Sequence, residues 1–473
     1  MNPEEFRRAG HALVDWIADY RTRVAKGDYP VEAQVRPGEV IESLPPAAPR
    51  RGEPFAKVLA DLDAKIIPGI THWHHPRFFG YFPTAGGLAS VLADMASTAL
   101  GVIGLNWQSS PALTELEQVT TDWMRDLLGL PKTFSGVIQD TASTSTLVAL
   151  LCARERASGF SGNEDGLQKG AAPLVVYTSE YAHSSVLKAA VLAGFGRKHV
   201  RMVETDDDFR LPAARLEAAI QADRAAGLTP CAVVATTGTT TMTAMDPVGA
   251  IADVATRYNL WLHVDGAMGG GAMVLPECRP LWAGVERADS VVVNAHKWLS
   301  AAFDCALYYV RDPEHLVRVM STSPSYLRTA QDEHVRNYRD WGIPLGRRFR
   351  ALKLWFVLRD QGVEAIQARL RRDLANAQWL AAQVRAAGDW KLLAPVPLQT
   401  LCLRHEPPGL SGEALDAHTQ KWARAINASG FAYITPAQLD GRWMVRVSIG
   451  AEATEREHVA ALWERMQEVA GSS

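Results

Sequence analysis

Six short apolar runs alternate with helix-like stretches between residues 112 and 310, and this alternation constrains the fold strongly. The runs are apolar throughout rather than at every second residue, which is typical of strands that are covered on both faces of a parallel sheet. Strands that alternate with helices predict a doubly wound α/β domain. The predicted strands are Pro173–Tyr177, Val200–Val203, Cys231–Ala235, Leu260–Val264, Ser290–Val293 and Ala306–Val310.

The regions on either side of this domain have different patterns. Apolar residues from Phe6 to Val24 recur near helical spacing, which predicts an amphipathic first helix. Prolines then punctuate residues 30–54, as expected for an extended connector. A first helix on such an arm has little core of its own, so we expect it to pack on another domain or subunit.

The C-terminal region predicts a smaller α+β domain. Helical stretches follow Gly346, strands are expected at Lys391–Arg404 and Trp443–Ile449, and a last helix is expected over 452–469. We therefore expect three parts: an N-terminal arm over 1–85, a cofactor-binding α/β domain over 86–365, and a small α+β domain over 366–473.

Composition and charge exclude several classes of protein. The 49 Lys and Arg nearly balance the 52 Asp and Glu, which gives no support to a polyanion-binding protein. The acidic, amphipathic start does not resemble a secretory signal, and no run approaches the roughly 20 apolar residues of a membrane helix. The five cysteines are widely spaced without a C-x-x-C pair, which disfavours disulfides and structural zinc and favours a cytoplasmic location.

Polar residues stand in the segments that follow four of the predicted strands. They are His183, a threonine cluster over 236–241, Asp265, and Asn294–Lys297. Open parallel sheets bind ligands outside the carboxyl ends of their strands. Taken singly, each residue has a commoner structural explanation in packing, turns, helix capping or surface solvation. Together they supply a lysine that can form an imine and an acid that can keep a heterocyclic nitrogen protonated.

The segment Gly136–Ser145 adds a candidate phosphate site. It places hydroxyl groups before a helix-like stretch, where free backbone N–H groups favour an anion. Neither G-x-x-x-x-G-K-[ST] nor G-x-G-x-x-G precedes a helix, which disfavours nucleotide binding. A phosphate on a small aldehyde-bearing ring remains, so we expect pyridoxal 5′-phosphate, with Lys297 as the imine-forming amine and Asp265 on the pyridine nitrogen.

Longer motifs extend over nearly the whole chain. In order, they are His72–Pro76, Tyr81–Thr84, Thr141–Ser143, Ala182–Ser185, His263–Asp265, Asn294–Trp298, Pro344–Arg350 and Arg446–Ser448. They resemble the pyridoxal-phosphate-dependent aromatic-L-amino-acid decarboxylases, the group II decarboxylases of fold type I, and are most similar to the bacterial L-DOPA decarboxylases. This resemblance implies an α/β fold of the fold type I transferase-like class, with a mostly parallel sheet in the large domain.

The resemblance also implies roles for individual residues. Lys297 is then the Schiff-base lysine, Asp265 pairs with the pyridine nitrogen, and His183 stacks on the ring. Tyr326 matches the catalytic tyrosine, at the start of a polar segment able to close over substrate, although from the residues alone a packing role is the simpler interpretation. The other implied cofactor contacts are Thr141, Ala142, Ser143, Thr240, Ala267, Asn294 and His296, and the implied substrate pocket comprises Trp73, Tyr81, Phe82, Pro83, Thr84, Ile103, Leu105 and Gly346.

These observations predict a homodimeric enzyme that releases CO₂ from an aromatic L-amino acid, with no metal, membrane or nucleic acid involved. L-DOPA is favoured, and tryptophan, 5-hydroxytryptophan, tyrosine and phenylalanine remain open. The alternatives are an aldehyde synthase, which decarboxylates and then deaminates oxidatively, an aminotransferase, and a pyridoxal-phosphate-binding protein without turnover.

Overall fold

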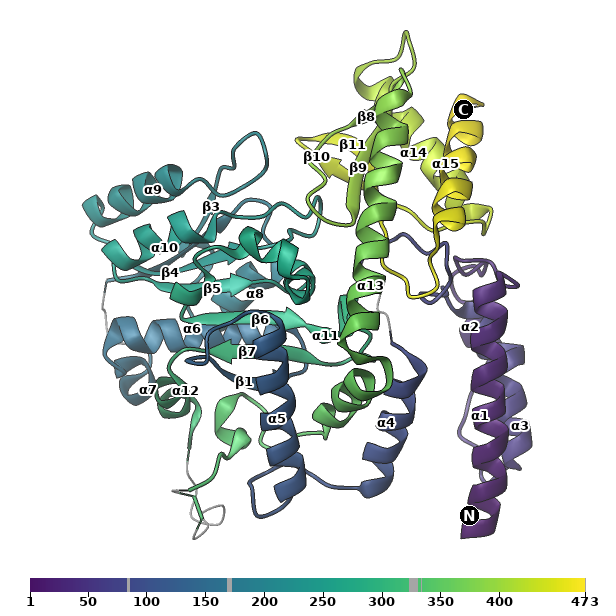
Figure 1. Cartoon of the computed structure of the whole chain (residues 1–473), viewed down its shortest axis with the longest axis horizontal. Helices are drawn as coiled ribbons and strands as arrows, with labels where there is room; N and C mark the ends of the chain where they lie inside the picture. The colour runs from purple at the N-terminus through teal and green to yellow at the C-terminus, as the bar shows by residue number, and fades with distance from the viewer. Residues whose placement is uncertain (83–85, 168–171, 323–330, 333, 473) are drawn as a thin grey trace. The chain divides into compact units, whose positions relative to one another are not determined.

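A computed structural model describes residues 1–473 except 83–85, 168–171, 323–330, 333 and 473. The chain forms two compact units (Figure 1). The large unit contains residues 84–371 and 394–398. The small unit contains residues 1–83, 372–393 and 399–473.

A seven-stranded sheet organises the large unit, in the order β1-β7-β6-β5-β4-β2-β3. The strands β2 to β6 pair in parallel, whereas β7 is antiparallel to both of its neighbours. This mixed, mostly parallel sheet confirms the expected α/β class. The strands are β1 (Ser135–Gln139), β2 (Leu174–Ser179), β3 (Val200–Val203), β4 (Thr229–Thr236), β5 (Trp261–Asp265), β6 (Ser290–Asn294) and β7 (Ala306–Val310).

Two features of the sheet differ from the sequence-based expectation. The apolar run at 306–310 forms a strand, but it is antiparallel to β6 and β1 rather than parallel. The segment at 135–139, expected to be part of a phosphate-binding loop, is itself the edge strand β1. Because β1 and β6 each run opposite to β7, their carboxyl ends lie at the same edge of the sheet.

Helices connect these strands and pack on the sheet. The helix α6 lies against five strands, β1, β4, β5, β6 and β7, and α5 packs on β1. The helices are α4 (Leu88–Leu100), α5 (Pro111–Leu127), α6 (Ala142–Ser158), α7 (Ser161–Asp165), α8 (Ser184–Leu192), α9 (Ala213–Ala225), α10 (Val248–Arg257), α11 (Ala295–Trp298), α12 (Pro313–Met320) and α13 (Arg350–Ala386). Gly362, with a φ of 73°, interrupts α13.

The small unit combines N-terminal helices with a four-stranded antiparallel sheet. Its first helix begins with a capping box between Asn2 and Glu5 and ends at Gly27, whose φ is 78°. The strand order is β10-β11-β9-β8. The elements are α1 (Pro3–Lys26), α2 (Glu39–Ser43), α3 (Phe55–Asp61), β8 (Trp390–Leu392), β9 (Thr400–His405), α14 (Gly412–Ala428), β10 (Thr435–Leu439), β11 (Arg442–Ser448) and α15 (Arg456–Gly471).

The five cysteines are all buried, and none of them is in a disulfide among the described residues. Burial raises the pKa of Cys231, Cys305 and Cys402 to about 12, so these thiols are protonated at neutral pH. Within the described ranges, no helix is long and apolar enough to cross a lipid bilayer. The same ranges hold no group of three or more His, Cys, Asp or Glu side chains that could bind a metal ion.

Candidate active site

The carboxyl edge of the large sheet carries the polar residues that the sequence singled out. Asp265 is the last residue of β5, and it lies beside Thr236 of β4 and Val292 of β6 in the strand register. The short helix α11 begins directly after β6 and contains Lys297. His183 stands at the start of α8, after β2. The sheet therefore brings these candidates to one edge.

His183, Asp265 and Lys297 interact electrostatically. Burial lowers the pKa of His183; the Asp265 carboxylate counteracts this shift, and the Lys297 ammonium adds to it. The ring of His183 is fixed at its Nδ1 atom, which accepts a hydrogen bond from the Ser185 backbone at 3.2 Å and lies 2.7 Å from the Ser185 hydroxyl. An Nδ1 atom that accepts a backbone bond leaves Nε2 to carry the proton of the neutral ring.

Backbone hydrogen bonds fix the residues that follow Asp265. The carboxylate is 4% exposed, and its Oδ1 atom accepts a bond from the Ala267 N–H at 3.1 Å. The Ala267 carbonyl in turn accepts a bond from the Asn294 N–H at 3.0 Å. The ends of β5 and β6 are thereby held together. No hydrogen bond to the second carboxylate oxygen of Asp265 is found among the described residues.

His263, two residues before Asp265 on β5, ties this strand to its neighbours. Its Nδ1 atom lies 2.9 Å from the Ser290 hydroxyl of β6, and its Nε2 atom lies 3.4 Å from the Thr146 hydroxyl of α6. Burial lowers the pKa of His263 to about 4, so the ring is neutral at physiological pH. The helix α6 is therefore tied by side chains to the strand that carries Asp265.

The start of α6 has the features of an anion site. Thr141 is the N-cap residue, with an extended backbone and no capping bond from its side chain among the described residues. Ala142 and Ser143 form the first turn, where backbone N–H groups have no intrahelical acceptor. The Asp140 carboxylate accepts a bond from the Thr141 N–H at 2.7 Å. This local bond occupies one oxygen of Asp140 within its own turn.

Three buried polar atoms at this edge have no hydrogen-bond partner among the described residues. They are Oδ1 of Asn294, Oγ1 of Thr236 and Oγ of Ser179, at the ends of β6, β4 and β2. A buried polar atom without a hydrogen-bond partner lowers the stability of the fold by roughly 1–3 kcal/mol. A polar ligand that bonds to these three atoms would remove that cost. A phosphorylated heterocyclic aldehyde fits this edge, because an amine, a carboxylate, a helix start and unpaired polar atoms are all present.

Two further cofactor candidates, Thr240 and His296, differ in their exposure. Thr240 is exposed on the loop after β4. His296 is buried, and its Nδ1 atom accepts a bond from the Cys305 N–H at 2.9 Å, next to the ring of Phe303. Burial, and then the charge of Lys297, lower the pKa of His296 to about 4. In this structure His296 bonds to the segment that leads into β7.

The substrate-pocket candidates belong to both units. In the small unit, the rings of Trp73 and Tyr81 stack with centroids 5.4 Å apart, and the Arg446 guanidinium lies 4.4 Å from the ring centroid of Phe82. In the large unit, Ile103 is 58% exposed, and its Cγ2 atom lies 3.4 Å from the place that a Cβ at Gly346 would occupy, while Leu105 is half-buried. Pro83, Thr84 and Tyr326 lie outside the described residues.

The sequence analysis included Thr236 only as part of a threonine cluster, and it did not single out Ser179. The signal that could have found them is their position as the last residues of β4 and β2, the same rule that identified Asp265. The predicted strands at 231–235 and 173–177 ended one and two residues too early. Thr236 and Ser179 were therefore assigned to the loops.

The fold and this edge together define a fold type I pyridoxal-phosphate enzyme. Residues 37–406 match the model of the pyridoxal-dependent decarboxylase conserved domain. The chain is 41% identical over 482 residues to tyrosine decarboxylase 4 of Petroselinum crispum, covering 99% of this chain and 94% of the relative. This chain belongs to the pyridoxal-dependent decarboxylase family, among its aromatic amino acid decarboxylases, and its cofactor is pyridoxal phosphate.

Solved structures agree with this assignment. The crystal structure of an Oryza sativa TDC with PLP and tryptamine has a TM-score of 0.95 and 35% identity, covering 100% of this chain and 99% of that one. A Rhodiola rosea 4-hydroxyphenylacetaldehyde synthase has a TM-score of 0.92 and 34% identity, with the same coverage. The chain is therefore similar both to a protein named as a decarboxylase and to one named as an acetaldehyde synthase.

Proposed function

We propose that this enzyme converts L-DOPA to its arylalkylamine and CO₂, with tyrosine and tryptophan as competing substrates. The observation that carries the decarboxylase chemistry is the group of His183, Asp265 and Lys297 at one sheet edge. L-DOPA is placed first because the sequence motifs resemble the bacterial L-DOPA decarboxylases. A relative named for tyrosine and a neighbour solved with tryptamine support the two competitors.

The roles of the central residues follow from their positions. Pyridoxal phosphate, when bound, supplies an aldehyde for the substrate amine and a ring that withdraws electrons from Cα. In our proposal, Lys297 would bind the aldehyde of the cofactor, and the second carboxylate oxygen of Asp265 would keep a proton on the ring nitrogen. His183 has its Nδ1 atom fixed by Ser185, which suits a ring held in one orientation.

The start of α6 is proposed to hold the phosphate. The N–H groups of Ala142 and Ser143 and the hydroxyls of Thr141 and Ser143 are donors at a helix N-terminus, where the dipole favours an anion. The unpaired oxygen of Asn294 is available to accept a bond from the cofactor. Thr240 and Ala267 complete the proposed set, from the loops after β4 and β5.

The last step is a proton transfer to the Cα that has lost CO₂. In our proposal the phenol of Tyr326 is the donor, with His183 as the alternative donor or a relay. A donor must come within about 2.6–3.2 Å of its target, or act through one water. Without that proton, Cα is exposed to oxygen, and the expected product is the aldehyde with ammonia and peroxide.

A panel of amino acids tests this function. The purified holoenzyme is incubated with L-DOPA, tyrosine, tryptophan, 5-hydroxytryptophan and phenylalanine, and CO₂, amine, aldehyde, peroxide and keto acid are quantified. We expect stoichiometric CO₂ and amine, with the highest kcat/KM for L-DOPA. Aldehyde with peroxide would identify a synthase, which the similarity to the Rhodiola rosea enzyme makes the second candidate. Keto acid would indicate an aminotransferase, and no product would indicate a binding protein.

We also propose that the enzyme is a homodimer. The α4 face exposes four large apolar side chains, and Ile103 beyond its end is more than half exposed. Several exposed apolar side chains on one helix suit a protein–protein contact. In the small unit, a groove of about 920 Å³ is lined by residues of α1 and by residues in and beside α3, both apolar, such as Trp16 and Phe55, and charged, such as Glu5 and Arg8. The exposed α4 side chains are Leu88, Leu92, Met95 and Leu100.

Light scattering tests this assembly. Leu92→Asp places a charge on the α4 face and should shift the mass to that of a monomer, whereas Leu192→Asp, at an exposed site on α8, should leave the dimer intact. Removal of residues 1–85 should also abolish dimer formation and activity. A dimer that persists in both Leu92→Asp and the truncated protein contradicts the proposal. The cytoplasmic location expected from the cysteines stays a prediction.

A further inference from the structure

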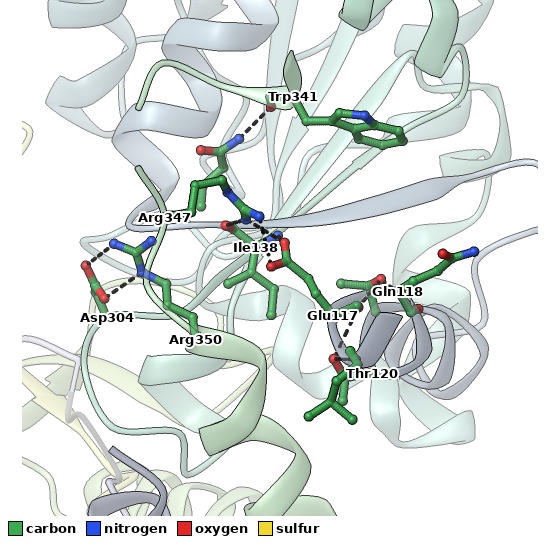
Figure 2. A network of polar contacts seen from close by, with 11 residues as sticks. Glu117, Gln118, Thr120, Ile138, Asp304, Trp341, Arg347 and Arg350 are labelled. Carbon is green, nitrogen blue, oxygen red and sulfur yellow. Dashed lines mark hydrogen bonds and ion pairs between the residues drawn. The ribbon is translucent and has the colours of Figure 1, made fainter. Parts of the chain in front are cut away.

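A buried ion pair lies beside the strand that leads into the proposed phosphate site (Figure 2). Glu117 of α5 is fully buried, and Arg347, just before α13, is 6% exposed. The two side chains form two parallel bonds, of 3.0 Å from Nη1 to Oε2 and 2.5 Å from Nη2 to Oε1. Such bidentate geometry fixes direction as well as distance.

The same pair binds both backbone groups of Ile138. The Ile138 N–H donates to Glu117 Oε1 at 2.8 Å, and the Ile138 carbonyl accepts from Arg347 Nη2 at 2.8 Å. Ile138 lies on the edge strand β1, opposite Leu307 of β7. In an antiparallel pair, every second residue directs its backbone groups away from the partner strand. The ion pair thus takes the place of a further strand at this edge.

The next residue, Gln139, is held by the same part of the chain. Its side-chain amide donates to the Trp341 carbonyl at 2.8 Å, and a Cβ at Gly342 would lie 2.6 Å from that amide nitrogen. The Arg347 carbonyl accepts a bond from the Gly104 N–H at 2.9 Å. Residues 341–347 therefore brace the last two residues of β1, and Asp140 and Thr141 follow directly.

A separate ion pair, at the start of α13, anchors the segment that follows Lys297. Arg350 donates to both carboxylate oxygens of Asp304, at 2.9 and 3.1 Å (Figure 2). Asp304 belongs to the segment between Lys297 and β7. The bonds of the Glu117–Arg347 pair therefore hold β1, which leads into the proposed phosphate site, whereas the segment after Lys297 is held by Arg350 and Asp304.

We propose that Glu117 and Arg347 are positioning residues for the cofactor phosphate. They fix Ile138 and, through it, the register of Asp140–Ala142, so that the N–H groups at the start of α6 meet the phosphate. A buried ion pair is weak evidence for stability, since two apolar side chains often stabilise a core as well. A directional role is one that two apolar side chains could not supply, because only the ion pair bonds to both backbone groups of Ile138. This inference rests on the proposed assignment of the phosphate to the start of α6.

The phosphate selectivity of the apoenzyme measures this role directly. Apoenzyme is titrated with pyridoxal phosphate and with pyridoxal, which lacks the phosphate, and binding is followed by quenching of tryptophan fluorescence. The ratio of the two dissociation constants isolates the phosphate contribution. Arg347→Met leaves the Glu117 charge buried and unpaired, so the double variant Glu117→Gln/Arg347→Met is the main test. In this double variant the side-chain amide oxygen at position 117 can still accept a bond from the Ile138 N–H, and no charge is left buried.

Two further variants serve as reference and control. Thr141→Val/Ser143→Ala removes proposed phosphate donors. Arg156→Met removes an arginine that forms two bonds to Asp289, whose carboxylate accepts the Leu262 N–H at 2.8 Å. That arginine–carboxylate pair lies at the amino ends of β5 and β6, away from the proposed phosphate site, and Asp289 keeps a second arginine, Arg311, at 2.8 Å in the variant. The unfolding midpoint in guanidinium is measured for every variant.

We expect the selectivity for the phosphate to fall about tenfold in the double variant, as for other supporting residues behind a binding site. Affinity for pyridoxal should change less than twofold, and Arg156→Met should keep the wild-type ratio. An unchanged ratio in the double variant, with a lowered one in Thr141→Val/Ser143→Ala, overturns the positioning role and leaves the phosphate assignment standing. An unchanged ratio in both overturns the phosphate assignment as well. If the selectivity for the phosphate falls equally in Arg156→Met, the loss reflects a general loss of rigidity in the sheet, and this outcome also overturns the proposal.

Discussion

Replacement of Gly238 by alanine tests how closely the loops after β4 and β5 approach each other. Gly238 has a φ of 92°, and a Cβ there would lie 2.8 Å from the backbone nitrogen of Gly269 and 2.9 Å from its Cα. The left-handed backbone costs a non-glycine residue about 1–2 kcal/mol. The overlap with backbone atoms, which cannot rotate away, adds about 1–3 kcal/mol. We therefore expect Gly238→Ala to lower the free energy of unfolding by about 2–5 kcal/mol.

Gly227→Ala is the matched control for this experiment. Gly227 has a φ of 78°, and a Cβ there meets no described atom within 4 Å, so it carries the backbone cost alone. Guanidinium unfolding of both apo variants, followed by tryptophan fluorescence, gives the difference. The two loops carry Thr240 and Ala267, so affinity for pyridoxal phosphate should also fall in Gly238→Ala. If Gly238→Ala is no less stable than Gly227→Ala, the close approach of the two loops is wrong.

The remaining predictions concern the chemistry and the pH dependence. Borohydride reduction of the holoenzyme should leave a pyridoxyl group on the peptide that contains Lys297, and a label on another lysine contradicts the assignment. The Asp265→Ala variant should still bind cofactor, although more weakly, and should lose most turnover. Tyr326→Phe should release CO₂ while its product shifts from amine to aldehyde under air, and an unchanged product ratio would return Tyr326 to a packing role. The pKa of His263 is about 4 in the folded protein against an ordinary 6.5, so the stability it contributes above pH 6.5 is lost as the pH falls toward 4. Unfolding of His263→Asn between pH 6.5 and 4 should therefore show a shallower pH dependence than the wild type, by up to about one proton, and an equal slope contradicts this.

The sequence predicted the strands that carry the candidate site, because each is a local apolar run followed by a polar residue. It did not predict β1, since Ser135–Gln139 contains a glycine and ends in a polar residue. The sequence did not predict the direction of β7 either, because a buried strand has the same apolar pattern whether it runs parallel or antiparallel to its neighbours. The expected strand at 391–404 is two strands, β8 and β9, since Pro395 and Pro397 interrupt it.

The Glu117–Arg347 pair shows why part of the site escapes sequence reasoning. The two residues are 230 positions apart, and neither stands at the end of a predicted strand. A glutamate within an amphipathic helix and an arginine in a basic stretch are most simply read as solvated surface residues. Their burial results from the packing of α5 and of residues 341–347 on β1, which no local pattern encodes.

The burial of all five thiols has a practical consequence. Protonated, inaccessible thiols do not react with alkylating reagents until the segment around them opens, so labelling rates report local unfolding. Cys402 lies in the small unit and the other four cysteines lie in the large unit. Mass spectrometry of labelled peptides would therefore time the opening of each unit separately, in the unmodified protein and without an introduced probe. Repeating the measurement with and without pyridoxal phosphate would show which unit the cofactor stabilises.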